Sequence, residues 1–203
     1  MSFGVLRVLN DDEVSAGMGF SKHGHSNMEI ISIPLEGDLE HKDSMGNTTV
    51  IKQGDIQAMS AGTGVQHSEK NKNRDKQVKF LQIWIIPNKQ NVEPKYDHIT
   101  LDSETLKNRF QQILSPNSDD YGVWIHQDAW FHLGEFETDQ NIEYSLKTPS
   151  NGAYIFILEG ECTVQDQKLE KRDGLGIWEA NVINFSIAKD MTKILLMEVP
   201  MAN

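Results

Sequence analysis

The sequence predicts an all-β protein with two antiparallel β-barrel lobes of the jelly-roll type and a short helical segment in the linker between them. Short β-branched and aromatic runs alternate with turn residues about every 8–12 residues, which is typical of sandwiches and barrels. The same strand and turn pattern also occurs twice along the 203 residues. We place the first lobe at residues 1–100 and the second at 101–203.

The strongest strand signals lie in the first half of the chain. A β-branched run that ends in glycine, MEIISIPLEG, occupies residues 28–37. A hairpin is expected over 38–55, because the tight-turn sequence DSMGN separates two short runs. Small residues dominate 56–69 (IQAMSAGTGVQHSE), and a buried strand closed by proline is expected at 78–87 (VKFLQIWIIP).

Residues 88–122 are polar and are interpreted as a linker between the lobes. One helical segment is expected at 103–114 (SETLKNRFQQIL). Ser103 is a plausible N-cap, and Pro116 follows the expected end of the helix.

Strand signals return over 121–137 and 153–180. The stretch 153–179 repeats the pattern of 28–60: an apolar strand, the tripeptide LEG, a polar hairpin, and a turn of Gly and Asp before the next strand. This internal repeat indicates two copies of one β unit. Only the first copy carries clusters of His and acidic residues, so we expect a site in the first lobe alone.

The bulk composition narrows the function classes. A formal net charge of −11 argues against a nucleic-acid partner, since such binding depends on a basic surface. The apolar runs are too short to span a bilayer, and the N-terminus lacks the features of a secretory signal. The one cysteine, Cys162, excludes an intramolecular disulfide and indicates a reducing compartment. We therefore expect a cytoplasmic protein without a membrane or nucleic-acid partner.

Two clusters of histidine and acid have the same spacing. His23 and His25 are two residues apart, and so are His67 and Glu69. Alternate side chains of a strand point to the same face. Two facing strands would therefore bring three imidazoles and one carboxylate together, which is a ligand set for one divalent transition metal.

The first cluster resembles a motif of the cupin superfamily, G-x5-H-x-H-x3-E-x6-G. Gly17, His23, His25 and Glu29 match this motif, and Gly37 follows one residue late.

The second cluster resembles the other cupin motif, G-x5-P-x-G-x2-H-x3-N. Gly54, Gly64, His67 and Asn71 match it, and Ala61 stands roughly where the proline would be.

Within the cupins, the chain resembles the pirin family, especially the bacterial pirin-like quercetin dioxygenases. The resemblance rests on LRVLNDDEV, LEGDLEHKDSMGN, MSAGTGVQHSE, QIWIIP and DGLGIWE, and it runs over essentially the whole chain. Family members usually carry a further segment before the LRVLNDD-like strand, whereas this chain starts at MSFGVLRVLNDD.

The resemblance implies a bicupin whose N-terminal barrel holds one metal through His23, His25, His67 and Glu69. The metal is usually iron, so we expect Fe(II), with Mn, Ni, Co, Cu or Zn as alternatives. Pirin-like proteins take the glutamate from the second cluster, and the shared strand face of His67 and Glu69 favours the same choice. We expect Glu29 to orient a ligand histidine.

The remaining candidate residues receive structural interpretations. Met59 is expected to line the pocket wall beside the second cluster. The other histidines (His41, His98, His126 and His132) are expected to be solvated or structural, Cys162 to pack as a small apolar residue, and Trp84, Trp124 and Trp178 to lie in the core.

The resemblance also implies an activity. A quercetin 2,3-dioxygenase opens a flavonol with O₂ to a depside and carbon monoxide. In such a site the metal would bind the 3-hydroxyl and 4-keto oxygens of the flavonol, and Glu69 would accept the hydroxyl proton. Two alternatives stay open. One is a non-enzymatic metal-binding pirin that responds to redox state and binds a protein partner, and the other is a metal-free structural bicupin.

Overall fold

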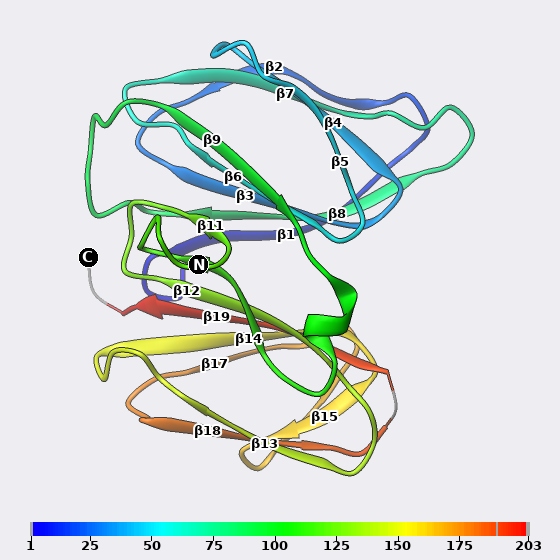
Figure 1. Cartoon of the computed structure of the whole chain (residues 1–203), viewed down its shortest axis with the longest axis vertical. Coiled ribbons are helices and arrows are strands. Elements are labelled where there is room, and N and C mark those ends of the chain that lie inside the picture. The colour runs from blue at the N-terminus through cyan, green and yellow to red at the C-terminus, as the bar shows by residue number, and fades with distance from the viewer. Residues whose placement is uncertain (1, 190, 202–203) are drawn as a thin grey trace. The chain divides into compact units, whose positions relative to one another are not determined.

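The computed structural model describes residues 2–189 and 191–201 and consists almost entirely of antiparallel strands (Figure 1). Within this part of the chain, the one helical element is a single 3₁₀ turn, η1 (Ser103–Leu106). The chain divides into two compact units. The first contains Leu6–Leu101 and Asn117–Gln127, and the second contains Asp102–Pro116 and the chain from Asp128 onward.

The first unit contains two sheets, with strand orders β1-β8-β3-β6-β9 and β2-β7-β4-β5. Their strands are β1 (Leu6–Val14), β2 (Gly19–His25), β3 (Glu29–Glu36), β4 (Asp38–Asp43), β5 (Thr48–Lys52), β6 (Asp55–Ser60), β7 (Val65–Asn71), β8 (Val78–Ile85) and β9 (Lys95–Thr100). The short β11 (Val123–Trp124) contacts β6 and β9. The predicted strands and the β4–β5 hairpin are thus present.

The second unit repeats this arrangement, with strand orders β10-β12-β19-β14-β17 and β13-β18-β15-β16. Its strands are β10 (Gln111–Ser115), β12 (Trp130–Phe136), β13 (Gln140–Ser145), β14 (Asn151–Glu159), β15 (Glu161–Val164), β16 (Gln167–Glu170), β17 (Gly174–Ile177), β18 (Val182–Ile187) and β19 (Thr192–Pro200). Its core includes Ile155, Phe185 and Leu196.

The fold is the predicted all-β, two-lobed architecture, but the sheets do not close into barrels. Each sheet of the first unit ends in two edge strands, β1 and β9 in one and β2 and β5 in the other. Burial on the strands explains how the sheets pack. Strand β3 is buried over its first six residues, as expected for the middle of a sheet. Strand β7 alternates buried and exposed residues, so one of its faces lines the interior.

The helical segment expected over 103–114 is present only as the η1 turn, and residues 88–122 are not just a linker. The stretch supplies β9 to the first unit and β10 to the second. The helical turn ends at Leu106 because Lys107 adopts an extended conformation, and Asp102 rather than Ser103 caps its start. The Asp102 side chain accepts a hydrogen bond from the backbone N–H of Glu104 at 3.0 Å.

Over the described residues, no helix has the length and apolar character that a membrane crossing requires.

Candidate metal centre

Three histidines converge on the interior side of strands β2 and β7. His23 is the direct cross-strand partner of His67, and His25 pairs with Val65. The three imidazole rings lie 4.5–5.0 Å apart between centroids. One ligand nitrogen from each ring lies within 4.8 Å of the others.

A β-bulge in β2 points His23 and His25 inward. Phe20 pairs with Glu69 but His23 pairs with His67, so three steps on β2 oppose two steps on β7. In a regular ladder Lys22 would stand opposite His67, and both histidines would face outward. Bulges of this kind re-aim side chains beside functional sites.

The bulge also determines which nitrogen of His23 faces the site. His23 Nδ1 lies 2.8 Å from the carbonyl oxygen of Ser21, which can only accept a hydrogen bond. Nδ1 therefore carries the proton and Nε2 presents a lone pair. This Nε2 lies 3.1 Å from His67 Nε2. Two ligand nitrogens that bind one ion at 2.0–2.1 Å and at right angles are about 3 Å apart, so the pair fits a shared cation.

Burial keeps the imidazoles of His25 and His67 in the neutral form that binds metal. Desolvation, followed by the charge of His23, lowers the pKa of His67 to about 3. The pKa of His25 is also lowered, again by burial first and by His23 second. Metal ligation requires neutral imidazole. In the described part of the chain, His67 Nδ1 is buried and has no hydrogen-bond partner.

Glu69 lies deeper than the three histidines and is completely buried. Its Oε1 accepts a hydrogen bond from Ser32 Oγ at 3.0 Å, and its Oε2 accepts one from Gln82 Nε2. Desolvation raises the pKa of this carboxyl to about 7. Its ligand atoms lie within 4.8 Å of those of His67 and His41, which form a second group that shares His67 with the first.

His41 is a site neighbour that the sequence analysis did not single out. It is completely buried and is the cross-strand partner of Glu69. Its Nε2 lies 3.1 Å from Asp43 Oδ2, its Nδ1 lies 3.5 Å from Gln57 Nε2, and its ring stacks on Tyr96 at 5.0 Å. The only hint in the sequence was the DSMGN turn, because Asp43 in this turn both caps the hairpin and orients His41.

Glu29 lies on the other face of β3. Residues 29 and 32 of a regular strand point to opposite sides, so Glu29 points away from the face on which Ser32 contacts Glu69. Its carboxylate accepts a hydrogen bond from Ser60 Oγ at 2.6 Å, and desolvation raises its pKa to about 7. Its expected role in orienting a ligand histidine stays a prediction.

Met59 lies close to the histidine cluster, packed in a fully buried group. It contacts Ile30 and Val65, with Trp84 against them, and the Trp84 ring lies 5.0 Å from the ring of His25. Met59 itself is not exposed, and its expected place in the pocket wall stays a prediction.

The second unit has apolar and aromatic residues where the first has its cluster. The two LEG turns (35–37 and 158–160) and the strand pairings that follow them align the two units. In this alignment, His41, Glu69, His67 and His23 correspond to Val164, Phe185, Ile183 and Tyr144. These four residues belong to the apolar core of the second unit, which leaves no ligand set there.

Two further residues of the second unit were given interpretations from the sequence. Cys162 is 2% exposed within the core, as expected, and burial raises its pKa to about 12. The expectation that Trp178 lies in the core is wrong, since the residue is 56% exposed just after the end of β17.

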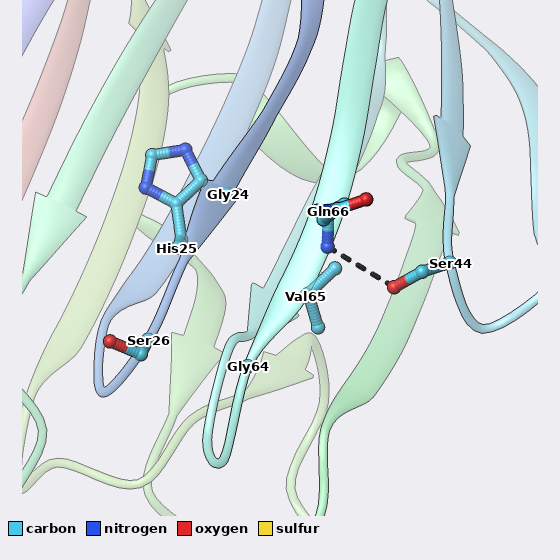
Figure 2. A pocket seen from close by; sticks show the side chains of 7 residues that line it. All are labelled: Gly24, His25, Ser26, Ser44, Gly64, Val65 and Gln66. Atoms are coloured by element: carbon cyan, nitrogen blue, oxygen red, sulfur yellow. Dashed lines mark hydrogen bonds between the residues drawn. The ribbon is translucent and has the colours of Figure 1, made fainter.

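An open pocket of about 440 Å³ lies beside the histidine cluster. Figure 2 shows His25 and Ser26 on one side, with Val65, Gln66 and Ser44 opposite them. Ser44 Oγ accepts a hydrogen bond from the backbone N–H of Gln66 at 3.1 Å. The volume is in the range of small-molecule sites, and His25 is common to the pocket and the cluster.

The fold and the site define the class of protein: a two-domain cupin whose first domain holds a partly buried cluster of histidines and glutamate. The chain belongs to the pirin family of cupins. The Pirin profile matches residues 2–85, and the profile of the quercetinase C-terminal cupin domain matches residues 112–199.

Similar proteins agree with this membership. The chain is 36% identical to a quercetin 2,3-dioxygenase of Escherichia coli K12, over 98% of this chain and 84% of that protein. It is 32% identical to a pirin-like protein of Caulobacter vibrioides, over 97% and 84% of the two chains. The crystal structure of the E. coli pirin YhhW with nickel(II) superimposes with a TM-score of 0.91 and 34% identity, over 98% and 84% of the chains.

Proposed function

We propose that this chain is a metal-dependent dioxygenase that opens a flavonol such as quercetin with O₂. The observation that carries the proposal is the convergence of His23, His25 and His67 next to an open pocket, with the carboxylate of Glu69 close to His67. It is supported by similarity over nearly the whole chain to a quercetin 2,3-dioxygenase and by the nickel(II) complex of a similar pirin.

The residues that would hold the metal are His23, His25, His67 and Glu69. Their imidazole nitrogens and carboxylate oxygen suit a divalent transition metal, with Fe(II) first and Mn, Ni, Co, Cu or Zn as alternatives. When bound, the metal would supply Lewis-acid polarisation of the flavonol oxygens and a site for O₂.

The chain's own residues would handle the substrate and its proton. The open pocket beside His25 would admit the flavonol. Glu69 would accept the proton of the 3-hydroxyl group, because a buried carboxylate with a pKa near 7 is well matched to that task. One O₂ is consumed, and one ring carbon leaves as carbon monoxide.

Several further features belong to the proposal. We assign the metal-bearing domain to residues 1–100 and a domain without a metal to 101–203, and we place the protein in the cytoplasm.

A second candidate function is a metal-binding regulator that docks a protein partner in response to redox state. The net charge of −11 favours this candidate, because an acidic protein attracts a basic partner.

The test is anaerobic purification with elemental analysis, followed by O₂ uptake with flavonols and other enolisable diketones. Metal-dependent O₂ uptake with release of carbon monoxide supports the dioxygenase. Redox-dependent partner binding without turnover supports the regulator instead. A protein that purifies without any metal, and binds none when it is supplied, contradicts both.

A further inference from the structure

The carboxylate of Glu69 is held by two donors on the facing sheet. Ser32 and Gln82 are cross-strand partners on β3 and β8, so their side chains lie next to each other. The Ser32 hydroxyl donates to one oxygen of Glu69, and the Gln82 amide donates to the other. We call this pair of donors the carboxylate cradle. Both residues are buried, so these hydrogen bonds are shielded from competition with water.

Trp84 determines which way the Gln82 amide points. The indole N–H of Trp84 donates to Gln82 Oε1 at 3.1 Å. Because a donor already occupies this oxygen, the amide nitrogen faces Glu69. The Trp84 ring also lies against His25. Trp84 therefore contacts both the cradle and the histidine cluster.

Resting on the proposed function, we propose that the cradle is the position that Glu69 occupies when it is not bound to the metal. Glu69 is grouped with His67 and His41 but not with His23 and His25, and both of its oxygens are engaged by the cradle. Metal binding then competes with the cradle for the carboxylate.

The cradle also supplies hydrogen-bond donors to the Glu69 carboxylate during turnover. A buried carboxylate without hydrogen-bond partners is costly. A glutamate that leaves the metal to accept a proton avoids this cost when two donors wait for it. Ser32 and Gln82 are thus positioning residues that act through Glu69.

The competition predicts an unusual effect of deleting a donor. Gln82→Leu removes an amide of similar size and should tighten nickel(II) binding to the metal-free protein by roughly tenfold, the effect expected for one hydrogen bond to a charged group. The melting temperature of the metal-free protein should fall, and that of the nickel-loaded protein should fall less. In a Glu69→Leu background, Gln82→Leu should lower the melting temperature of the metal-free protein less, because only the hydrogen bond from the Trp84 indole is then lost.

Two further variants keep the test independent of one substitution. Ser32→Ala removes the other donor and should shift nickel affinity in the same direction. Ser60→Ala is the matched control, because it also removes a hydroxyl from a buried glutamate, but on the opposite face of β3. Nickel affinity should be unchanged in this control. Isothermal titration with nickel(II) and thermal denaturation give both readouts without any turnover.

Nickel binding that is weaker or unchanged in both Gln82→Leu and Ser32→Ala overturns the inference. Weaker binding would show that the two donors hold Glu69 in its metal-bound position. A wild-type protein that binds neither nickel(II) nor Fe(II) overturns this inference and the proposed function together. Nickel binding with the predicted shifts, but without flavonol turnover, contradicts the proposed activity alone.

Discussion

His23 and His67 face each other across the β2–β7 ladder with their Nε2 atoms 3.1 Å apart. The lone pair of His23 points at this contact because its Nδ1 is bonded to the carbonyl of Ser21. A neutral His67 ring can donate its Nε2–H to this lone pair. Burial lowers the pKa of His67 to about 3, so the ring stays neutral, and the tautomer with its proton on Nδ1 would let both Nε2 atoms bind one cation.

Removing either histidine should therefore remove the metal and leave the fold. His23→Ala and His67→Ala are expected to purify with little bound metal, against one metal per chain in the wild type. Each unit has its own apolar core, including the cluster of Leu39, Ile51 and Phe80 in the first. Elemental analysis and far-UV circular dichroism check this, and a spectrum that collapses together with metal loss contradicts it.

The two buried glutamates should differ in their effect on the reaction. Glu69→Gln keeps the size and one ligand oxygen but cannot accept the substrate proton. Activity per bound metal should fall by about 10²–10⁴-fold, the usual contribution of a general base. Glu29→Gln should cost much less, because Glu29 lies on the opposite face of β3. Single-turnover rates, expressed per metal, make the comparison, and a dead Glu29 variant beside an active Glu69 variant would reverse our assignment.

Glu29 should instead affect the pH dependence of stability. Burial raises its pKa from 4.5 to about 7, so the folded protein holds this proton more tightly than the unfolded chain does. Its contribution to the free energy of unfolding is complete below pH 4.5 and is lost as the pH rises to about 7, by about 3 kcal/mol at most.

Urea denaturation from pH 4.5 to 8 measures this effect. Glu29→Gln keeps an acceptor for Ser60 and should flatten the stability profile relative to the wild type. Equal slopes for the two proteins over this range would contradict the assignment.

Gln66 should influence substrate affinity more than catalysis. It lines the pocket beside His25, and its side chain is exposed. Gln66→Ala removes one hydrogen-bonding group and should raise KM for quercetin about fivefold with little change in kcat. A flavonol without hydroxyls on its pendant ring is the control substrate, for which KM should change less. An unchanged KM for both substrates would place Gln66 outside the binding pocket.

Any redox response should come from the metal and not from the cysteine. Cys162 is 2% exposed, and burial raises its pKa to about 12, so little thiolate forms at neutral pH. Iodoacetamide should modify the native protein far more slowly than the urea-unfolded chain. Rapid alkylation in the native state would reopen Cys162 as the redox sensor of the regulator hypothesis.

The sequence alone was sufficient for features that depend on local pattern. Short strands with turn residues between them predicted an all-β fold, and the repeated LEG pattern predicted two copies of one unit. The i, i+2 spacings singled out His23, His25, His67 and Glu69, because side-chain alternation along a strand is a local property. The polar stretch 88–122 was predicted to be a linker, but it contributes two strands. These strands form only through pairing with distant partners, β9 with β6 and β10 with β12.

Only the tertiary structure decided how the cluster is assembled. The bulge at Ser21 and Lys22 turns His23 and His25 inward. No residue type in that stretch predicts a bulge. The burial of His41 beside Glu69 depends on the register of β4 against β7. Ser32 and Gln82 donate hydrogen bonds to Glu69 although they are 37 and 13 positions from it in the chain. The packing of the two sheets brings them together. Such contacts depend on how strands pair and stack, which local sequence patterns do not encode.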